Sequence, residues 1–282
     1  MSVKIVTDST SYLPAHLRDK YDIKVISLGV SFGEEVFKEE EMENSEFYVK
    51  MDGGEEVPTS SPPSINEFLE LFEDIIKDGH SVLGVFLSSD LSETYSRASI
   101  AKQILLEKYP KAVIEVMDSR TTCMQSSFMS LAAALALDEH LSMEELVKIA
   151  QTKLYKSRFL FSPEVLDYLK KGGRIGKAAA LLGSIFQIRP ILTVVDGKID
   201  VLGKVRTKEK AVKKMLETFL EDVEGREIGN VVIHHINNEE EAIELAKIIE
   251  EKIEKQVDVH SIGPVIGLHV GPGTLGIVYS IE

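Results

Sequence analysis

Residues 81–117 read SVLGVFLSSDLSETYSRASIAKQILLEKYPKAVIEVM, and this stretch decides the class of fold. Residues 81–87 and 112–117 are apolar runs with the length of buried strands. Between them, residues 92–109 repeat apolar side chains at helical spacing, with an expected inner face of Tyr95, Ala98, Ala101, Ile104 and Leu105. Two strands joined by a helix predict a parallel sheet covered by helices.

The same alternation extends over the first 157 residues. Further strands are predicted over residues 4–7 and 24–30, and further helices over 122–139 and 142–155. Ser64 with Glu67, and Ser142 with Glu145, have the spacing of capping boxes, so each serine is expected to open a helix. Residues 33–61 are acidic and rich in turn residues, and we expect them to form a mobile excursion.

After residue 157 the order of elements changes, which predicts a second α/β domain over residues 158–282 with a mixed sheet. Asp196-Gly197 stands between two β-type runs and is a strong hairpin signal. A helix is expected to start at Ser162-Pro163-Glu164 and to end at Gly172-Gly173. Residues 159–161 and 231–236 predict strands, and residues 208–221 and 238–254 predict helices.

Residues 265–282 read VIGLHVGPGTLGIVYSIE. Gly271, Gly273 and Gly276 have the spacing of a dinucleotide-binding motif, but that motif needs a helix directly after its glycines. The β-type run 277–282 follows instead. The sequence therefore predicts a turn between two strands, with His269 at its rim.

The composition bounds the class of protein. The chain has 282 residues, 44% of them hydrophobic, and a formal net charge of −14, which argues against nucleic acid as the main partner. No apolar run reaches the length of a membrane span and no secretion signal is present, so we expect a cytoplasmic protein. The single cysteine, Cys123, excludes an intramolecular disulfide and is expected to be a packed thiol.

Positive charge is concentrated in the middle of the chain. Residues 153–214 carry 15 Lys and Arg against 5 Asp and Glu. The lysines of the helix predicted over 208–221 fit an ordinary solvated face. Arg174 and Arg206 lie beside turn or strand ends, and this explanation fits them less well.

Four hydroxyl-rich loops adjoin predicted strands and helices at one edge of the first sheet. They are Asp8-Ser9-Thr10, Thr59 to Ser64, Ser88 to Ser92, and Asp118-Ser119-Arg120. Any one of them could simply cap a helix. Together, hydroxyls and helix N-termini make a site for an anionic head group.

Seven motifs resemble, in order and spacing, those of the DegV family. They are Asp8-Ser9-Thr10, Pro58 to Ser64, Ser88 to Tyr95, Asp118-Ser119-Arg120, Leu169 to Ile175, Lys204-Val205-Arg206 and His269 to Gly273. The resemblance covers essentially the whole chain. It implies a two-domain α/β protein, divided near residue 157, that holds a long-chain fatty acid between its domains.

Some members of that family are the fatty-acid-binding subunit of bacterial fatty acid kinase and present the carboxylate to a separate kinase. The resemblance therefore implies a lipid carrier with no chemistry of its own and no cofactor beside the bound fatty acid. It further implies a kinase as protein partner and transient membrane contact during lipid exchange.

The resemblance also assigns residues. It places the fatty-acid carboxylate at Ser60, Ser92 and His269. Supporting polar groups would come from Asp8, Ser9, Thr59, Ser89 and Thr94, and contacts to a partner or phosphate from Arg174 and Arg206. The family usually has threonine where Ser60 stands and glycine where Glu93 stands. A Glu93 carboxylate turned inward would repel an anionic head group.

Three alternatives stay open. A serine hydrolase could use Ser92, Asp118 and His269, although the Gly-x-Ser-x-Gly elbow is absent. A metal site could use His234-His235, but adjacent residues of a strand point to opposite faces and no ligand cluster accompanies them. A regulatory lipid-binding protein without a kinase partner would have the same sequence features.

Overall fold

The computed structural model describes residues 2–53, 58–183 and 188–282 and divides the chain into two compact units. The first unit consists of Met1–Gly29, Lys38–Glu40 and Ser61–Tyr155. The second consists of Val30–Phe37, Glu41–Ser60 and Lys156–Glu282, so it takes in two segments from the amino-terminal half. Each unit has its own central sheet and its own apolar core.

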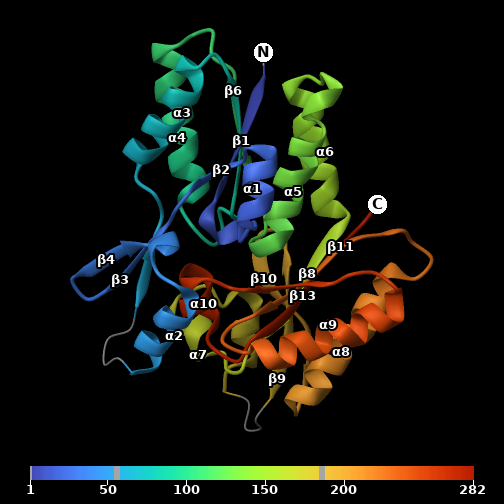
Figure 1. Ribbon diagram of the computed structural model, residues 1–282. Helices are drawn as coiled ribbons and strands as arrows, with labels where there is room; N and C mark the ends of the chain where they lie inside the picture. Colours follow the sequence, from blue (N-terminus) through green and yellow to red (C-terminus); the bar gives the residue numbers. More distant parts are fainter. Residues whose placement is uncertain (1, 54–57, 184–187) are drawn as a thin grey trace. The chain divides into compact units, whose positions relative to one another are not determined.

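The central sheet of the first unit is parallel throughout, as the sequence predicted. Its strand order is β2-β1-β6-β7 (Figure 1). The strands are β1 (Val3–Asp8), β2 (Lys24–Ile26), β6 (Ser81–Phe86) and β7 (Ile114–Asp118). The strand predicted over 24–30 is divided in two, because the chain leaves the sheet at Ser27 and resumes as β3 (Gly29–Phe32).

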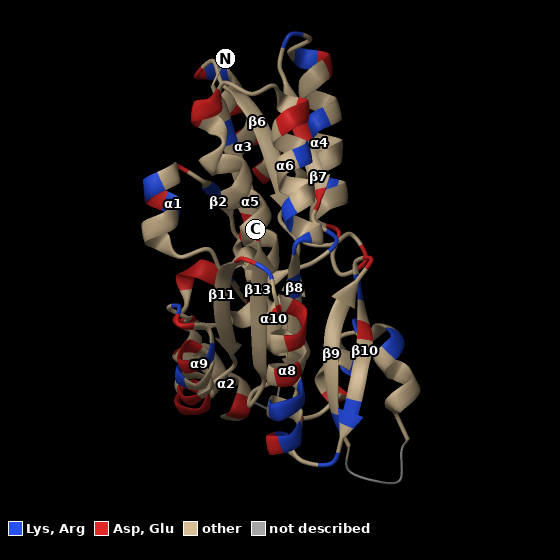
Figure 2. Cartoon of the chain, turned by 90° about the vertical axis from the view of Figure 1, so that its right-hand side faces the viewer, with Lys and Arg blue, Asp and Glu red and all other residues tan. Residues whose placement is uncertain are grey.

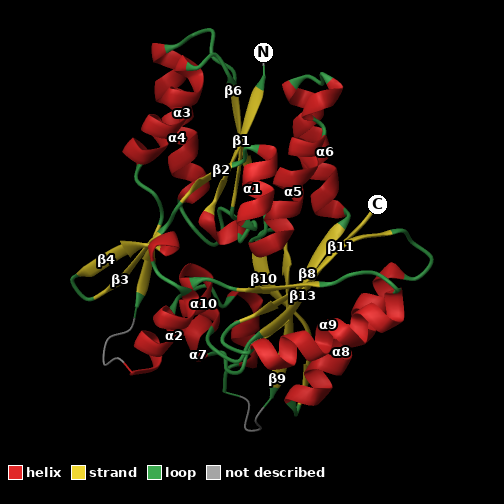
Figure 3. Cartoon of the chain, in the orientation of Figure 1, coloured by secondary structure: helices red, strands yellow, loops and turns green. Residues whose placement is uncertain are grey.

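Helices cover both faces of this sheet (Figure 3). They are α1 (Ala15–Tyr21), α3 (Ile65–Lys77), α4 (Thr94–Lys108), α5 (Cys123–Leu135) and α6 (Met143–Tyr155). Side chains alternate along β1, so Ile5 packs with α1, α5 and α6 while Val6 packs with α3 and α4. Short 3-10 turns span Ser9–Ser11, Glu39–Glu41, Leu137–Glu139 and, in the second unit, Gly176–Leu181.

Local signals in the sequence identified most of these elements. Both capping boxes are confirmed, since Ser64 and Ser142 each accept a bond from the N–H of the glutamate three residues on and donate one back to it. Cys123 is buried, and burial raises the pKa of its thiol, as expected of a packed cysteine. The prediction was wrong for Ile104, whose side chain is 43% exposed on the outer face of α4.

The central sheet of the second unit is mixed, as predicted, with the order β10-β9-β8-β13-β11-β12. Only the pair β11–β12 is parallel among the pairings described. The strands are β8 (Ser157–Ser162), β9 (Arg189–Val195), β10 (Lys198–Val205), β11 (Ile228–His235), β12 (Asp258–Ser261) and β13 (Leu275–Ile281). Asp196 and Gly197 have φ angles of 49° and 83°, which confirms the predicted hairpin turn between β9 and β10.

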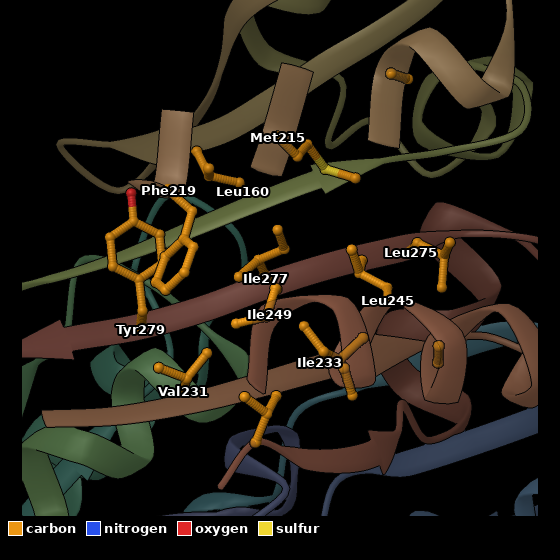
Figure 4. Close-up of a cluster of buried hydrophobic side chains, with 14 of the residues drawn as sticks. Leu160, Met215, Phe219, Val231, Ile233, Leu245, Ile249, Leu275, Ile277 and Tyr279 are labelled. Atoms are coloured by element: carbon orange, nitrogen blue, oxygen red, sulfur yellow. The ribbon is translucent and has the colours of Figure 1, made fainter. Parts of the chain in front are cut away.

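Two long helices, α8 (Lys208–Val223) and α9 (Glu239–Ile253), bury their apolar faces against one side of this sheet. Figure 4 shows the resulting core, in which β13 supplies Ile277 and Tyr279. Phe219 of α8 meets the ring of Tyr279 edge-on, with 5.0 Å between centroids. An edge-on approach is a favoured geometry for aromatic rings, and it fixes the helix along the strand.

Two predicted elements of the second unit were wrong. The strand expected over 265–270 is a helix, α10 (Pro264–Val270), which opens with proline at its first position. Six of its seven residues are buried, all except His269, and a short helix buried on nearly every side has no polar face to distinguish it from a strand. The helix expected from Ser162 begins later, as α7 (Asp167–Lys171), because Ser162 is the last residue of β8 and pairs with Leu275 of β13. The helix ends before Gly172, as predicted.

The segment 33–61, expected to be a mobile excursion, forms regular elements. They are β4 (Glu35–Lys38), α2 (Asn44–Gly53) and β5 (Thr59–Ser61), with β4-β3-β5 as a small third sheet. Phe47 and Tyr48 are buried and fix α2, although the segment is acidic. Residues 54–57 of that stretch lie outside the described residues. Within the described ranges, the helices lack the length and apolar character needed to cross a membrane.

Candidate functional site

A cavity of about 350 Å³ in the second unit brings together several of the predicted residues. Helix α10 packs against both α7 and α2, as Figure 1 shows, and the cavity opens where these helices meet β5. Its lining consists of Met51, Pro58, Thr59, Ser60, Tyr168, Lys171, Gly172, Arg174, Leu268 and His269. This volume is within the range of small-molecule sites.

Ser60 and His269, both in the lining, contact each other directly. The Oγ atom of Ser60 lies 2.9 Å from Nε2 of His269, a hydrogen bond between β5 and the last turn of α10. The two residues are 209 positions apart in the sequence. The fold therefore brings together two of the three residues that were predicted to bind a carboxylate.

The environment of His269 keeps its imidazole neutral at pH 7. Burial, and after it the positive charge of Arg174, lowers the pKa of His269 to about 4. The Nδ1 atom is buried and makes no hydrogen bond to the described residues. It lies against Gly172, where an added Cβ would overlap it.

These facts assign the tautomer of His269. A buried N–H without an acceptor is rarer in proteins than a buried acceptor without a donor. We therefore place the proton on Nε2, which donates to Ser60 Oγ. A serine hydroxyl can donate one hydrogen bond and accept two. Because Ser60 Oγ accepts the bond from His269, its own hydrogen remains available to an anion in the cavity.

Two cations belong to the same lining. Lys171 ends α7, and Arg174 follows three residues later, with its Nη1 donating to the carbonyl of Gly172 at 2.7 Å. Arg206 lies directly after β10 and is not part of this lining. The lysines on α8 fit a solvated face, since Lys213 is 75% exposed in its side chain (Figure 2).

The hydroxyl-rich loops of the first unit bond mainly to one another. Asp8 accepts the N–H of Leu87 at 2.7 Å, and Ser89 donates to Asp118 at 2.5 Å, which joins the ends of β1, β6 and β7. Burial raises the pKa of Asp8 to about 6. These contacts stabilise the carboxyl edge of the sheet.

The remaining supporting residues have similar local bonds. Ser9 donates to the buried carboxylate of Glu39 at 2.5 Å, within the first unit. Thr59 lies 2.9 Å from Ser31 Oγ in the third sheet and also lines the cavity.

Ser92 belongs to the first unit, in the loop that leads into α4. Its hydroxyl lies 2.9 Å from that of Thr94 and accepts the N–H of Thr94 at 3.3 Å. Glu93, where the family resemblance leads us to expect glycine, has a side chain that is 71% exposed and forms an ion pair with Arg97 at 2.9 Å. The Glu93 carboxylate therefore points to solvent.

Several lining residues were not predicted from the sequence. Lys171 lies within the Leu169–Ile175 motif, so its place beside Gly172-Gly173 could have identified it as a candidate for the site. Met51 gave none, because it lies in the segment that was expected to be a mobile excursion. Tyr168 lay in a predicted helix and Leu268 in a predicted strand, and neither carried a signal for a site, because their place in the lining depends on the packing of α7 against α10.

The catalytic alternatives find little support in the geometry. Within the first unit Asp118 bonds to Ser89 and Arg120, and within the second His269 bonds to Ser60. Ser60 and His269 resemble a nucleophile and base, but a pKa near 4 makes His269 a weak base at pH 7. No described group of three His, Cys, Asp or Glu side chains could hold a metal ion.

The protonation of His269 yields a testable expectation. Its pKa falls from an ordinary 6.5 to about 4 on folding, so its contribution to stability is complete above pH 6.5 and is lost as the pH falls through 4. Denaturant unfolding of the wild type and of His269→Gln between pH 7.5 and 4 should show the wild type losing more stability. Parallel curves, with His269 titrating near 6.5 by NMR, would contradict the assignment.

Comparison with known proteins places these features in a family. Residues 2–282 match the model of the DegV family of uncharacterised proteins. A DegV domain-containing protein of Clostridium acetobutylicum is 48% identical over 282 residues, covering 100% of this chain and 99% of the relative. Protein DegV of Bacillus subtilis is 35% identical, covering 100% of both chains.

Solved structures agree over the same length. DegV of Bacillus subtilis, described as a fatty acid binding protein, superposes with a TM-score of 0.90 at 32% identity, covering 100% of both chains. A DegV family protein of Thermus thermophilus, whose structure concerns fatty acid binding, has a TM-score of 0.90 at 29% identity with the same coverage. The match over residues 2–282 and the identity to curated relatives show that this chain belongs to the DegV family.

Proposed function

We propose that this protein binds a long-chain fatty acid and presents its carboxylate to a separate kinase for acyl-phosphate formation, with no chemistry of its own. The observation that carries the proposal is the Ser60–His269 hydrogen bond inside a cavity that also has Lys171 and Arg174 in its lining. The fatty-acid-binding relatives of Bacillus subtilis and Thermus thermophilus support the choice of ligand.

The site has the donors that an anionic head group requires. A carboxylate removed from water is costly unless hydrogen-bond donors replace its hydration. The Ser60 hydroxyl can donate to it, and the charges of Lys171 and Arg174 favour an anion there. Ser92 remains the third donor implied by the family resemblance.

The acyl chain would supply most of the affinity. About 15 methylenes at about 0.8 kcal/mol each give a gross term of about 12 kcal/mol before the cost of association. A lipid held this strongly should survive purification. Lipid exchange would involve transient contact with a membrane, and the carrier needs no cofactor beside the fatty acid.

Organic extraction of the purified protein, followed by mass spectrometry, tests the carrier function. The extract should contain one or more long-chain fatty acids in near-stoichiometric amount, and a mock purification without the protein should not. An empty protein that also fails to bind added palmitic acid would exclude this function.

Substitutions at the three predicted carboxylate-binding residues test the position of the head group. Because one charge-assisted hydrogen bond contributes about 1.5–3 kcal/mol, Ser60→Ala and Ser92→Ala should each weaken binding about ten- to a hundredfold without abolishing it. His269→Ala, which removes the bond that orients the Ser60 hydroxyl, should weaken binding by no more than that. Kinase-coupled phosphorylation should fall further than lipid retention. Ser60→Thr keeps the hydroxyl and should retain function, and the exposed Ser45 of α2 provides a control as Ser45→Ala.

Equal losses in lipid retention and phosphorylation, or no loss in either, would count against these residues. Normal lipid binding with no phosphorylation by any kinase of the source organism would instead favour a regulatory lipid-binding protein.

Substitution of Arg174 and Arg206 tests whether these side chains contact a partner or stabilise the structure. Changing Arg206 to alanine should leave the melting temperature and fatty-acid retention nearly unchanged while lowering acyl-phosphate formation. Changing Arg174, whose charge also favours the head group, should lower acyl-phosphate formation more than it lowers retention, and the double variant should lose the most coupled activity. Arg226, an exposed arginine of the same unit, serves as the control. A fall in melting temperature or lipid retention that matches the loss of coupled activity would place both arginines among the structural ion pairs.

A further inference from the structure

The start of α10 is held by a tyrosine from a distant part of the chain. Tyr48 of α2 is 1% exposed, and its hydroxyl donates to the carbonyl of Ile262 at 2.8 Å, with the carbonyl of Gly263 at 3.2 Å. One helical turn earlier, Asn44 donates to Ser261 Oγ at 3.1 Å. Asn44 and Tyr48 share one face of α2, and that face binds the three residues that lead into α10.

Gly267 fits this contact. It lies in the middle of α10, where a Cβ would overlap the Tyr48 hydroxyl. Glycine inside a helix costs about 0.5–1 kcal/mol relative to alanine, a notable cost for a helix of seven residues. The close approach of the tyrosine gives a physical reason for the glycine.

The contact lies close to the site described above. His269 follows Gly267 by two residues, and its Nε2 must lie within hydrogen-bond distance of Ser60 on a different element. On the other side, Gly172 lies against Nδ1 of His269. Because α10 is short and packed against α2 and α7, a shift at its start would also move its last turn. Hydrogen bonds weaken steeply beyond about 3.2 Å, so the Ser60–His269 bond is sensitive to such a shift.

We propose that Tyr48 is a positioning residue for the carboxylate site. The absence of a side chain at Gly267 lets the Tyr48 hydroxyl approach, and its hydrogen bond fixes the position of α10 so that His269 can bond to Ser60. This inference rests on the proposed function. Tyr48 does not line the cavity and acts through the backbone, whereas Met51, three residues further along α2, lines the cavity directly. α2 therefore contributes one wall of the cavity and also fixes the helix that carries His269.

The test is Tyr48→Phe, which keeps the buried ring and removes the hydroxyl. Dissociation constants are measured for palmitic acid and for its methyl ester, which has the same chain without a charged head group. The variant should lose about tenfold in affinity for the acid, the equivalent of one hydrogen bond, and little for the ester. Tyr155→Phe, at a tyrosine that is 78% exposed, is the matched control and should change neither value.

A second readout needs no lipid. In the variant, His269 should be less firmly held and less buried, so its pKa should rise from about 4 toward 6.5 in an NMR titration of the imidazole. Gly267→Ala, which displaces the tyrosine, should produce the same two changes. Asn44→Ala, outside the core, should produce smaller changes in the same direction, and it provides the test if Tyr48→Phe does not fold.

The outcomes separate the two hypotheses. If the wild type binds neither palmitic acid nor its ester, the proposed function fails, and the titration of His269 still decides the role of Tyr48. If the wild type prefers the acid while Tyr48→Phe keeps the same acid-to-ester ratio and the same pKa at His269, the positioning role is overturned. Equal losses for acid and ester would show a general structural role and would also overturn it.

Discussion

The second unit depends on where β13 pairs. This strand lies between β8 and β11 and is antiparallel to both, with Ile277 opposite Leu160 on one side and Ile233 on the other. All three side chains are buried in the core beneath α8 and α9. Because side chains alternate along a strand, a slip of one residue would turn Ile277 out of that core. Burial of these side chains therefore favours one register.

The turn between α10 and β13 connects the paired strand to the helix that carries His269. Gly271 and Gly273 have φ angles of 89° and 79°, in the region that favours glycine. The N–H of Gly273 donates to the carbonyl of Ile236 at 2.8 Å, and the hydroxyl of Thr274 donates to that of Gly271 at 2.8 Å. These bonds tie the end of α10 to the end of β11, with His269 two residues before Gly271. The position of His269 therefore depends on the pairing of β13 in the sheet.

The chemistry of the cavity follows from burial and charge together. A buried imidazole beside Arg174 cannot easily accept a proton, so His269 is neutral and donates through Nε2. Its hydrogen bond fixes the hydroxyl of Ser60, and Lys171 and Arg174 bring positive charge to the same lining. Such a group of donors is suited to hold an anion in a fixed orientation and poorly suited to general-base catalysis.

The sequence by itself determined the elements whose signals are local. Capping boxes at Ser64 and Ser142 and the Asp196-Gly197 turn depend on neighbouring residues and were predicted correctly, as was the alternation that gives the first unit its parallel sheet. The ordered motifs also indicated the family and the candidate residues Ser60 and His269. Only the tertiary structure decided that residues 264–270 are a helix, because a segment buried on every side has no periodic pattern. It also decided that Ser60 meets His269 and that Tyr48 meets α10, since contacts across more than 200 residues arise from packing that no local pattern encodes.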